Sequence, residues 1–339
     1  MHSLIDPFGR RTRYLRVSVT DRCNFRCAYC MPRGGAPTGP RESLLTYEEI
    51  LTVVRAAAEL GITSIRITGG EPLVRRDLTW LVAHIAEIPG ISDLSMTTNG
   101  ALLARYAQEL AASGLRRVNV SLDSLRPDRF AAITCGGRLD DVMDGIRAAL
   151  NAGLRPVKVN VVVMRGVNDD EVADLARLSY DGELTVRFIE LMPVGPALPP
   201  RECAGLGTMG DARSLLVPAA RIRAAIEALG PLEPAATDVG VGPARYWRLE
   251  GAKGLIGIIS QVTEHACAAC NRLRLTPDGM LRPCLMDDGE VDLRTPLRSG
   301  AGVEEIKARI VRTVEQKPEK MRAIGEIKLA GRYMSQIGG

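Results

Sequence analysis

The chain has 339 residues, which is enough to bury one large core with additions. Its 44 basic and 40 acidic residues give a formal net charge of +4 without a block of like charge, so bulk charge favours neither nucleic-acid nor membrane binding. The N-terminus lacks an apolar signal segment, and no stretch approaches the ~20 apolar residues that span a bilayer. We therefore expect a cytoplasmic protein.

Short β-branched runs alternate with amphipathic helical patterns over the first 192 residues, which is typical of βαβ units and a parallel sheet. The predicted strands cover 14–20, 63–68, 93–98, 116–122, 156–163 and 185–191. The predicted helices cover 47–60, 77–88, 101–113, 139–152 and 169–179.

One face of these strands is polar, because side chains on a strand alternate between its two faces. A closed eight-stranded barrel is packed with branched apolar side chains, so a polar inner face favours an open or wider barrel that holds a polar ligand. The alternative is an open sheet with one wet face, although crossover helices usually cover both faces. The polar positions are Arg16, Ser18, Thr20, Ser64, Arg66, Thr68, Ser95, Thr97, Asn99, Asn119, Ser121, Asp123, Lys158 and Asn160.

The pattern changes after a Pro/Gly-rich connector at about 194–210. A helix around 218–229, several short strands from 245 to 285 and a helix around 303–316 follow. We expect two regions, covering 1–192 and 193–339.

Three cysteines, Cys23, Cys27 and Cys30, follow the first strand with C-x3-C-x2-C spacing. A second triplet of cysteines lies near the C-terminal end, and two tight triplets in a large chain without a signal segment favour metal ligation over disulfides. A [4Fe–4S] cube has four irons, so three cysteines leave one iron open, whereas the alternative, structural zinc, is normally closed. The spacing closely resembles the radical S-adenosylmethionine (SAM) superfamily, in which the open iron binds SAM.

That resemblance extends along the first region. The "GGEP" loop follows the second strand, where members of the superfamily hold the SAM amino group, and "TTNG" and "SLDSL" close the third and fourth strands. The SAM-binding residues implied by the resemblance are Tyr29, Gly69, Gly70, Glu71, Pro72, Ser121 and Met192.

A second triplet, Cys267, Cys270 and Cys284, has C-x2-C-x13-C spacing. A "TPDG" turn predicts a hairpin centred near 277 that brings Cys270 and Cys284 almost opposite, ~4.5–5.5 Å apart at Cα. This predicts one metal site, either a second cluster with an open iron or zinc with His265 as the fourth ligand.

Two arginines, Arg272 and Arg274, share a strand face with Cys270, while Leu273 and Leu275 point to the other face. Guanidinium groups form bidentate hydrogen bonds with phosphate, so the alignment favours an anion such as a triphosphate. Surface salt bridges are the alternative.

Motifs along nearly the whole chain are similar to those of the GTP 3′,8-cyclase family: "LRVSVTDRCNFRCAYCMP", "IRITGGEPLVRRDL", "VKVNVVVMRGVND", "RFIELMPVG", "CAACNRLRLTPDGMLRPCL" and "MSQIGG". The resemblance implies an α/β fold, an incomplete (β/α)6 TIM-type barrel with a C-terminal α+β extension that carries a second iron–sulfur cluster. It implies a lyase of molybdenum cofactor biosynthesis that cyclises GTP.

The same resemblance implies roles for individual residues. It assigns GTP binding to Arg16, Arg66, Thr97, Lys158, Arg272, Leu273 and Arg274, and catalytic roles to Arg272, Arg274, Gly338 and Gly339 of the diglycine end.

The expected cofactors are two [4Fe–4S] clusters and SAM, and the expected partners are GTP and an unidentified one-electron donor. We also expect a possible hand-off to cyclic pyranopterin monophosphate synthase and a monomer or homodimer. Cys135 and Cys203 are interpreted as thiols without a role. The alternatives are a radical SAM peptide-modifying enzyme and an electron-transfer iron–sulfur protein, although the latter normally ligates every iron with protein.

Overall fold

The computed structural model describes residues 4–32, 34–180, 184–194, 201–203, 207–209, 213–236, 242–321 and 331–338, with backbone only for 201–203 and 207–209. Gly339, the Cys203 side chain and most of the connector at 194–210 lie outside the described residues. No helix in the described part of the chain combines the length and the apolar character needed to cross a bilayer.

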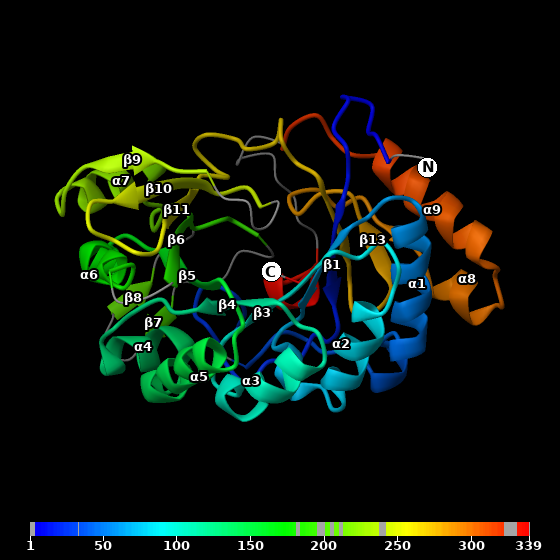
Figure 1. The fold of residues 1–339 in the computed structure, drawn as a ribbon, viewed down its shortest axis with the longest axis horizontal. Coiled ribbons are helices and arrows are strands. Elements are labelled where there is room, and N and C mark those ends of the chain that lie inside the picture. The colour runs from blue at the N-terminus through cyan, green and yellow to red at the C-terminus, as the bar shows by residue number, and fades with distance from the viewer. Residues whose placement is uncertain are drawn as a thin grey trace.

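Six parallel strands curve around the centre of the molecule, and their helices cover the outside (Figure 1). The strands are β1 (Tyr14–Ser18), β2 (Ser64–Thr68), β3 (Asp93–Thr98), β4 (Arg117–Ser121), β5 (Val157–Val163) and β6 (Leu184–Glu190). The helices are α1 (Tyr47–Glu59), α2 (Leu78–Ala86), α3 (Leu103–Ala112), α4 (Pro127–Thr134), α5 (Leu139–Asn151) and α6 (Val172–Arg177), with the short η1 (Arg41–Ser43), η2 (Pro72–Val74) and η3 (Asp169–Glu171).

All six predicted strands and five predicted helices are confirmed, and their ends shift by a few residues. The short helix α4 was not predicted. It begins with Pro127, whose fixed φ suits a first helical turn, and ends at Cys135 in the left-handed conformation.

The C-terminal part extends both edges of this sheet. Strand β12 (Arg272–Leu275) pairs in parallel with β1, and β11 (Ile256–Ile259) pairs in parallel with β6. Antiparallel strands continue outward, giving a twelve-stranded sheet in the order β14-β13-β12-β1-β2-β3-β4-β5-β6-β11-β10-β9. The added strands are β9 (Leu232–Pro234), β10 (Arg245–Leu249), β13 (Met280–Arg282) and β14 (Val291–Asp292), whereas β7 (Arg201–Cys203) and β8 (Gly207–Met209) pair only with each other. The helices of this part are α7 (Ala219–Glu227), α8 (Arg294–Arg298), α9 (Val303–Glu315) and the short η4 (Met334–Gln336).

The core lies between the outer face of the sheet and the helices. Alternate strand positions such as Leu15, Val17, Ile65 and Ile67 are at most 1% exposed, and burying each aliphatic side chain stabilises the fold by about 1.5–3 kcal/mol. The opposite face therefore carries the polar side chains into the interior, as predicted. At one end of the core, Thr46 begins α1 through reciprocal hydrogen bonds with Glu49.

Candidate functional site

Both cysteine triplets line one cavity of about 270 Å³ inside the curved sheet. The first triplet enters from the loop after β1, and the second enters from the segments before and after the β12–β13 hairpin. The cysteines that line it are Cys23, Cys27, Cys30, Cys267, Cys270 and Cys284. The sheet closure therefore brings together two motifs that are far apart in the sequence.

The loop of the first triplet is held by the end of α4. The backbone N–H groups of Arg26 and Ala28 donate to the carbonyl oxygens of Thr134 and Ile133 at 3.0 and 2.8 Å. Burial, reinforced by neighbouring Cys30, raises the pKa of the Cys27 thiol well above its usual value. Three close thiolates are therefore stable there only beside a positively charged centre, and this donor set fits an iron–sulfur cluster.

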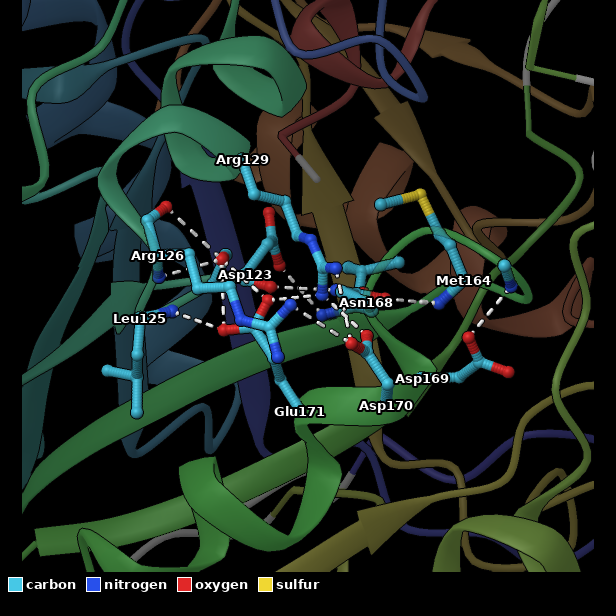
Figure 2. A network of polar contacts seen from close by, with 12 residues as sticks. Asp123, Leu125, Arg126, Arg129, Met164, Asn168, Asp169, Asp170 and Glu171 are labelled. Carbon is cyan, nitrogen blue, oxygen red and sulfur yellow. Dashed lines mark hydrogen bonds and ion pairs between the residues drawn. The ribbon is translucent and has the colours of Figure 1, made fainter. Parts of the chain in front are cut away.

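A hydrogen-bond network stands beside this loop (Figure 2). The Tyr29 hydroxyl donates to Asp123 Oδ2 at 2.8 Å, and Val162 N donates to Oδ1 at 2.8 Å. Burial raises the pKa of Asp123 to about 6. Asn168 Nδ2 donates to the carbonyl oxygen of Asp123 at 2.7 Å. The end of β4 and the triplet loop are thus fixed relative to each other.

Glu171 anchors the same network and is 1% exposed. Its carboxylate accepts hydrogen bonds from Ser124 Oγ at 2.7 Å, Leu125 N at 2.8 Å and Arg129 Nη1 at 2.7 Å (Figure 2). Neither Asn168 nor Glu171 was selected by sequence reasoning. The "GVND" motif is part of the resemblance, but the hydrogen-bond partners of Asn168 and Glu171 lie 45 and 46 residues away, so no local sequence pattern indicates them.

Two residues of the "GGEP" loop line the cavity, and the other two are buried beside it. Gly69 and Gly70 line the cavity, and a Cβ at Gly69 would lie 2.8 Å from the carbonyl oxygen of Thr20, which excludes any side chain. Glu71 and Pro72 are buried and are not among the lining residues. Glu71 accepts from Asn99 N at 2.6 Å and Thr98 Oγ1 at 2.8 Å, and burial raises its pKa to about 7.

The second hairpin differs from the predicted register. Arg274 pairs with Arg282, and Leu275 pairs with Leu281. Continued outward, this register sets Cys284 across from Arg272 rather than from Cys270. The cause is a three-residue loop, Pro277 to Gly279, which Thr276 closes by donating its N–H to Met280 O at 2.8 Å. The predicted centre at 277 was therefore one residue too early.

The sulfurs of the second triplet accept hydrogen bonds from protein N–H groups. Gln261 Nε2 lies 3.6 Å from Cys267 Sγ, and Lys317 Nζ lies 3.7 Å from Cys270 Sγ. Burial alone would raise the pKa of Cys270, but Arg272 and Lys317 lower it to about 6. Such donors and a stabilised thiolate fit a metal centre, because hydrogen bonds to the sulfurs tune iron–sulfur clusters.

His265, the alternative zinc ligand, is exposed. Among the side chains that the structure describes, no three His, Cys, Asp or Glu residues are grouped as ligands of a single metal ion. The cysteines of a [4Fe–4S] cube bind different irons and therefore stand wider apart than the ligands of one ion.

Arginines form a row across three neighbouring strands of the inner face. Arg274 on β12, Arg16 on β1 and Arg66 on β2 are register partners, and all three line the cavity. Burial, followed by the neighbouring arginines, lowers the pKa of each guanidinium, and the pKa of Arg66 is lowered to about 9. Like charges side by side destabilise a sheet, so the row is suited to a polyanion.

Arg187 on β6 also lines the cavity and was not selected by sequence reasoning. Its Nη2 donates to Asn119 Oδ1 at 2.7 Å and to Asn160 Oδ1 at 2.6 Å. Thr185, Arg187 and Ile189 share one face of a predicted strand, and this was the available signal.

Lys158 is 3% exposed and is not among the residues that line the cavity. Its Nζ donates to the Tyr246 hydroxyl at 3.3 Å. Burial, together with Arg187, Arg117 and Arg66, lowers its pKa to about 6.

Of the remaining predicted site residues, most line the cavity and one is buried in the hydrophobic core. Leu273 does not bring its side chain to the cavity: it is 1% exposed within the main hydrophobic core, so only its backbone remains available. This follows from its place between two inward arginines. The lining residues include Tyr29, Thr97, Ser121, Met192 and Arg272. Near the C-terminus, the carbonyl oxygen of Gly338 accepts hydrogen bonds from Arg16 and Arg274.

Comparison with known proteins identifies relatives of both halves of the chain. A family model for the radical SAM superfamily matches residues 17–179, and one for Molybdenum Cofactor Synthesis C matches residues 184–323. A GTP 3′,8-cyclase from Pelotomaculum thermopropionicum is 51% identical over 98% of this chain and 99% of its own length. One from Heliobacterium modesticaldum is 50% identical over 99% of this chain and 100% of its own length.

Among solved structures, SuiB of Streptococcus suis aligns with 85% of this chain and 65% of its own length. The TM-score is 0.58 and the sequence identity is 14%, so this similarity concerns the fold alone.

Proposed function

The chain belongs to the GTP 3′,8-cyclase family of the radical SAM superfamily, and from this premise we propose how its cavity serves the reaction. The protein is a radical SAM enzyme that converts GTP into 3′,8-cyclo-7,8-dihydro-GTP, the first step of molybdenum cofactor biosynthesis. The observation that carries this function is the single cavity lined by both cysteine triplets and the arginine row between them.

The first triplet and the adjoining loops form the SAM site. Cys23, Cys27 and Cys30 would hold the iron–sulfur cluster. Gly70 lines the cavity, and only a residue without a Cβ fits there, because a Cβ would clash with the backbone of Arg22. When bound, SAM and the reduced cluster supply the 5′-deoxyadenosyl radical that removes the ribose 3′ hydrogen. The further SAM contacts that we propose are Tyr29, Gly69, Ser121 and Met192, all of which line the cavity.

The arginine row binds the GTP triphosphate. Guanidinium groups match phosphate oxygens bidentately, and an anion relieves the repulsion within the row. The Thr97 hydroxyl is buried at the cavity without a hydrogen-bond partner among the described residues, which supports a ligand contact there. Lys158 and the backbone of Leu273 complete our proposed set with Arg16, Arg66, Arg272 and Arg274.

The protein contributes orientation and exclusion of water. Side chains from strands on opposite sides of the cavity hold the ribose and the base in one orientation, so the entropic cost of aligning the reacting atoms is met on binding. Gly338 adds a backbone wall held by Arg16 and Arg274, with no side chain near the reacting groups. We propose the same for Gly339, which lies outside the described residues.

Cys267, Cys270 and Cys284 would hold a second [4Fe–4S] cluster and would leave one of its irons without a protein ligand, free to bind GTP. The N–H donors to their sulfurs support this proposal. Substituting Cys284→Ala and measuring iron and sulfide after anaerobic reconstitution tests it. We expect about eight irons per wild-type chain and about four in the variant. An unchanged iron content would exclude the second cluster.

The activity itself is tested by anaerobic incubation with SAM, dithionite and GTP, followed by mass spectrometry. We expect 5′-deoxyadenosine and the cyclised nucleotide to appear together and only with GTP. If 5′-deoxyadenosine forms at the same rate with and without GTP, a peptide substrate would be favoured instead.

The proposal also covers the electron donor, the enzyme that receives the product and the oligomeric state. We propose an unidentified one-electron donor, hand-off of the product to cyclic pyranopterin monophosphate synthase, and a monomer or homodimer. We also place the boundary between the two regions at 192/193, after β6, because the six parallel strands end at Glu190.

A further inference from the structure

A buried lysine lies against the second triplet. Lys317 follows α9 and is 3% exposed. Its Nζ donates to the carbonyl oxygen of Arg272 at 2.7 Å, to the carbonyl oxygen of Pro283 at 2.9 Å and to Cys270 Sγ at 3.7 Å. Cys270 precedes β12 and Arg272 begins it, whereas Pro283 directly precedes Cys284. One amine thus ties together the two segments that carry the cysteines.

These three contacts indicate the charged form of the side chain. An ammonium has three N–H donors and no acceptor, whereas a neutral amine has two donors and a lone pair. Every neighbour of Lys317 Nζ named above is an acceptor, so all three donors are used. Burial, together with Arg10 and Arg272, lowers the pKa of Lys317, whereas Cys270 and Cys284 raise it. The three acceptors favour the ammonium, and at 3% exposure little solvent screens its charge from the sulfurs.

The N-terminal segment holds this lysine in place. Arg10 donates through Nη2 to the carbonyl oxygen of Pro318 at 2.6 Å and through Nη1 to that of Glu319 at 2.9 Å. The same Nη1 donates to the carbonyl oxygen of Cys267 at 2.9 Å, and Asp6 pairs with Arg10 Nε at 2.5 Å. Through Arg10, the backbone directly after Lys317 is therefore tied to both the N-terminal segment and the carbonyl oxygen of Cys267.

We propose that Lys317 is a positioning and charge-compensating residue of the second cysteine site, which orients Cys270 and stabilises the reduced form of the cluster held there. The inference rests on the proposed second cluster. When that cluster gains one electron from an external one-electron donor, its net charge falls by one unit and no bond forms or breaks. A fixed cation stabilises the more negative form, so it raises the reduction potential.

The test compares Lys317→Gln with Lys317→Arg, which keeps the charge. Iron and sulfide are counted after anaerobic reconstitution, and both clusters are titrated with dithionite while their electron paramagnetic resonance signals are followed. The first cluster serves as an internal reference in the same chain. Arg312→Gln removes an exposed positive charge on α9 that does not line the cavity, and it is the control, because solvent screens exposed charges.

We expect Lys317→Gln to leave the first cluster's midpoint unchanged. At a given potential the ratio of reduced to oxidised second cluster should fall about tenfold, which corresponds to 59 mV for a one-electron couple. Lys317→Arg and Arg312→Gln should stay near the wild type. Loss of the second cluster in Lys317→Gln but not in Lys317→Arg would also support the proposal, since charge then decides assembly.

An unchanged second midpoint in Lys317→Gln would overturn the inference. Loss of the second cluster in both Lys317 variants would do the same, because shape rather than charge would then matter. If Lys317→Gln fails to fold, Lys317→Met, which keeps an unbranched side chain without the charge, takes its place in the same comparison. About four irons in the wild type would instead refute the second cluster itself, which is a distinct result.

Discussion

Arg274 Nη1 donates a hydrogen bond to the carbonyl oxygen of Gly338 at 2.8 Å, across 64 positions of sequence. Arg16 Nε donates to the same oxygen at 3.1 Å. The C-terminal segment therefore ends inside the curved sheet, where Figure 1 shows it in red near the strands. Gly338 has φ +70°, and a Cβ there would lie 2.8 Å from Thr68 Cγ2 and 3.1 Å from Ser18 Cβ. Only glycine fits this position.

Substituting Gly338→Ala should lower the rate of GTP cyclisation roughly hundredfold, because displacement of groups around the reacting atoms by about 1 Å has effects of that size. The measurement is single-turnover product formation by mass spectrometry. Gly331→Ala is the matched control, since Gly331 also has a positive φ but open space around it. Equal losses in the two variants would show that backbone strain, not the wall at Gly338, is responsible.

GTP binding should take up a proton through Lys158. Its pKa of about 6 means that the amine is largely neutral above that pH in the free protein. A nearby triphosphate favours the ammonium and raises the pKa, so affinity should rise as pH falls toward about 6 and level off below it. Calorimetry in buffers of different ionisation enthalpy measures the uptake.

Lys158→Met should abolish the part of the uptake that exceeds the titration of GTP itself. It should weaken GTP binding about 10- to 100-fold, the value of a hydrogen bond to a charged group. Identical proton uptake in both proteins would contradict the assignment.

The same pKa implies that the contribution of Lys158 to the free energy of unfolding rises between about pH 6 and 10.5, because over that range the unfolded chain holds a proton that the folded chain has lost.

Glu171→Gln should destabilise the fold by about 2 kcal/mol and raise the KM for SAM. Both carboxylate oxygens accept from donors, so an amide N–H group would face a donor in either orientation. The end of β4, which carries Ser121, would then loosen. Denaturant unfolding and SAM titration are the measurements.

Asp170→Asn provides the control for this prediction. Asp170 is adjacent, pairs with Arg129 and has a side chain 50% exposed, so its pair should contribute less than about 1 kcal/mol. A smaller effect for Glu171→Gln than for Asp170→Asn would refute the proposed role of the network in Figure 2.

Glu190→Gln should loosen the segment that leads to Cys267. Glu190 is 0% exposed, and its carboxylate accepts from Ala219 N at 2.8 Å, Val262 N at 2.8 Å and Thr263 N at 2.9 Å. We expect faster amide hydrogen exchange at 262 and 263, with a loss of about 2 kcal/mol. Glu264→Gln, at a partly exposed position nearby, should leave exchange at these amides nearly unchanged. Unaltered exchange in Glu190→Gln would contradict the prediction.

Much of the incomplete barrel could be predicted from sequence, because polar and apolar residues alternate with a two-residue period along each strand. That period separates Arg16 and Arg66, which line the cavity, from Leu15 and Ile65, which are buried against the helices. It also shows that the Leu273 side chain points away from Arg272 and Arg274. The cysteine spacing was equally informative, since ligands close in sequence must be close in space.

The sequence by itself determined the order and type of the main elements, the polar face of the strands and the two cysteine triplets, because all of these depend on local spacing. Only the tertiary structure decided that β12 pairs with β1, that the hairpin centre lies one residue later, and that Glu171, Glu190 and Lys317 meet their partners. Periodicity reports the face on which a side chain lies but not the strand that lies beside it. Strand neighbours and buried polar partners are selected by packing between distant segments, which leaves no local pattern.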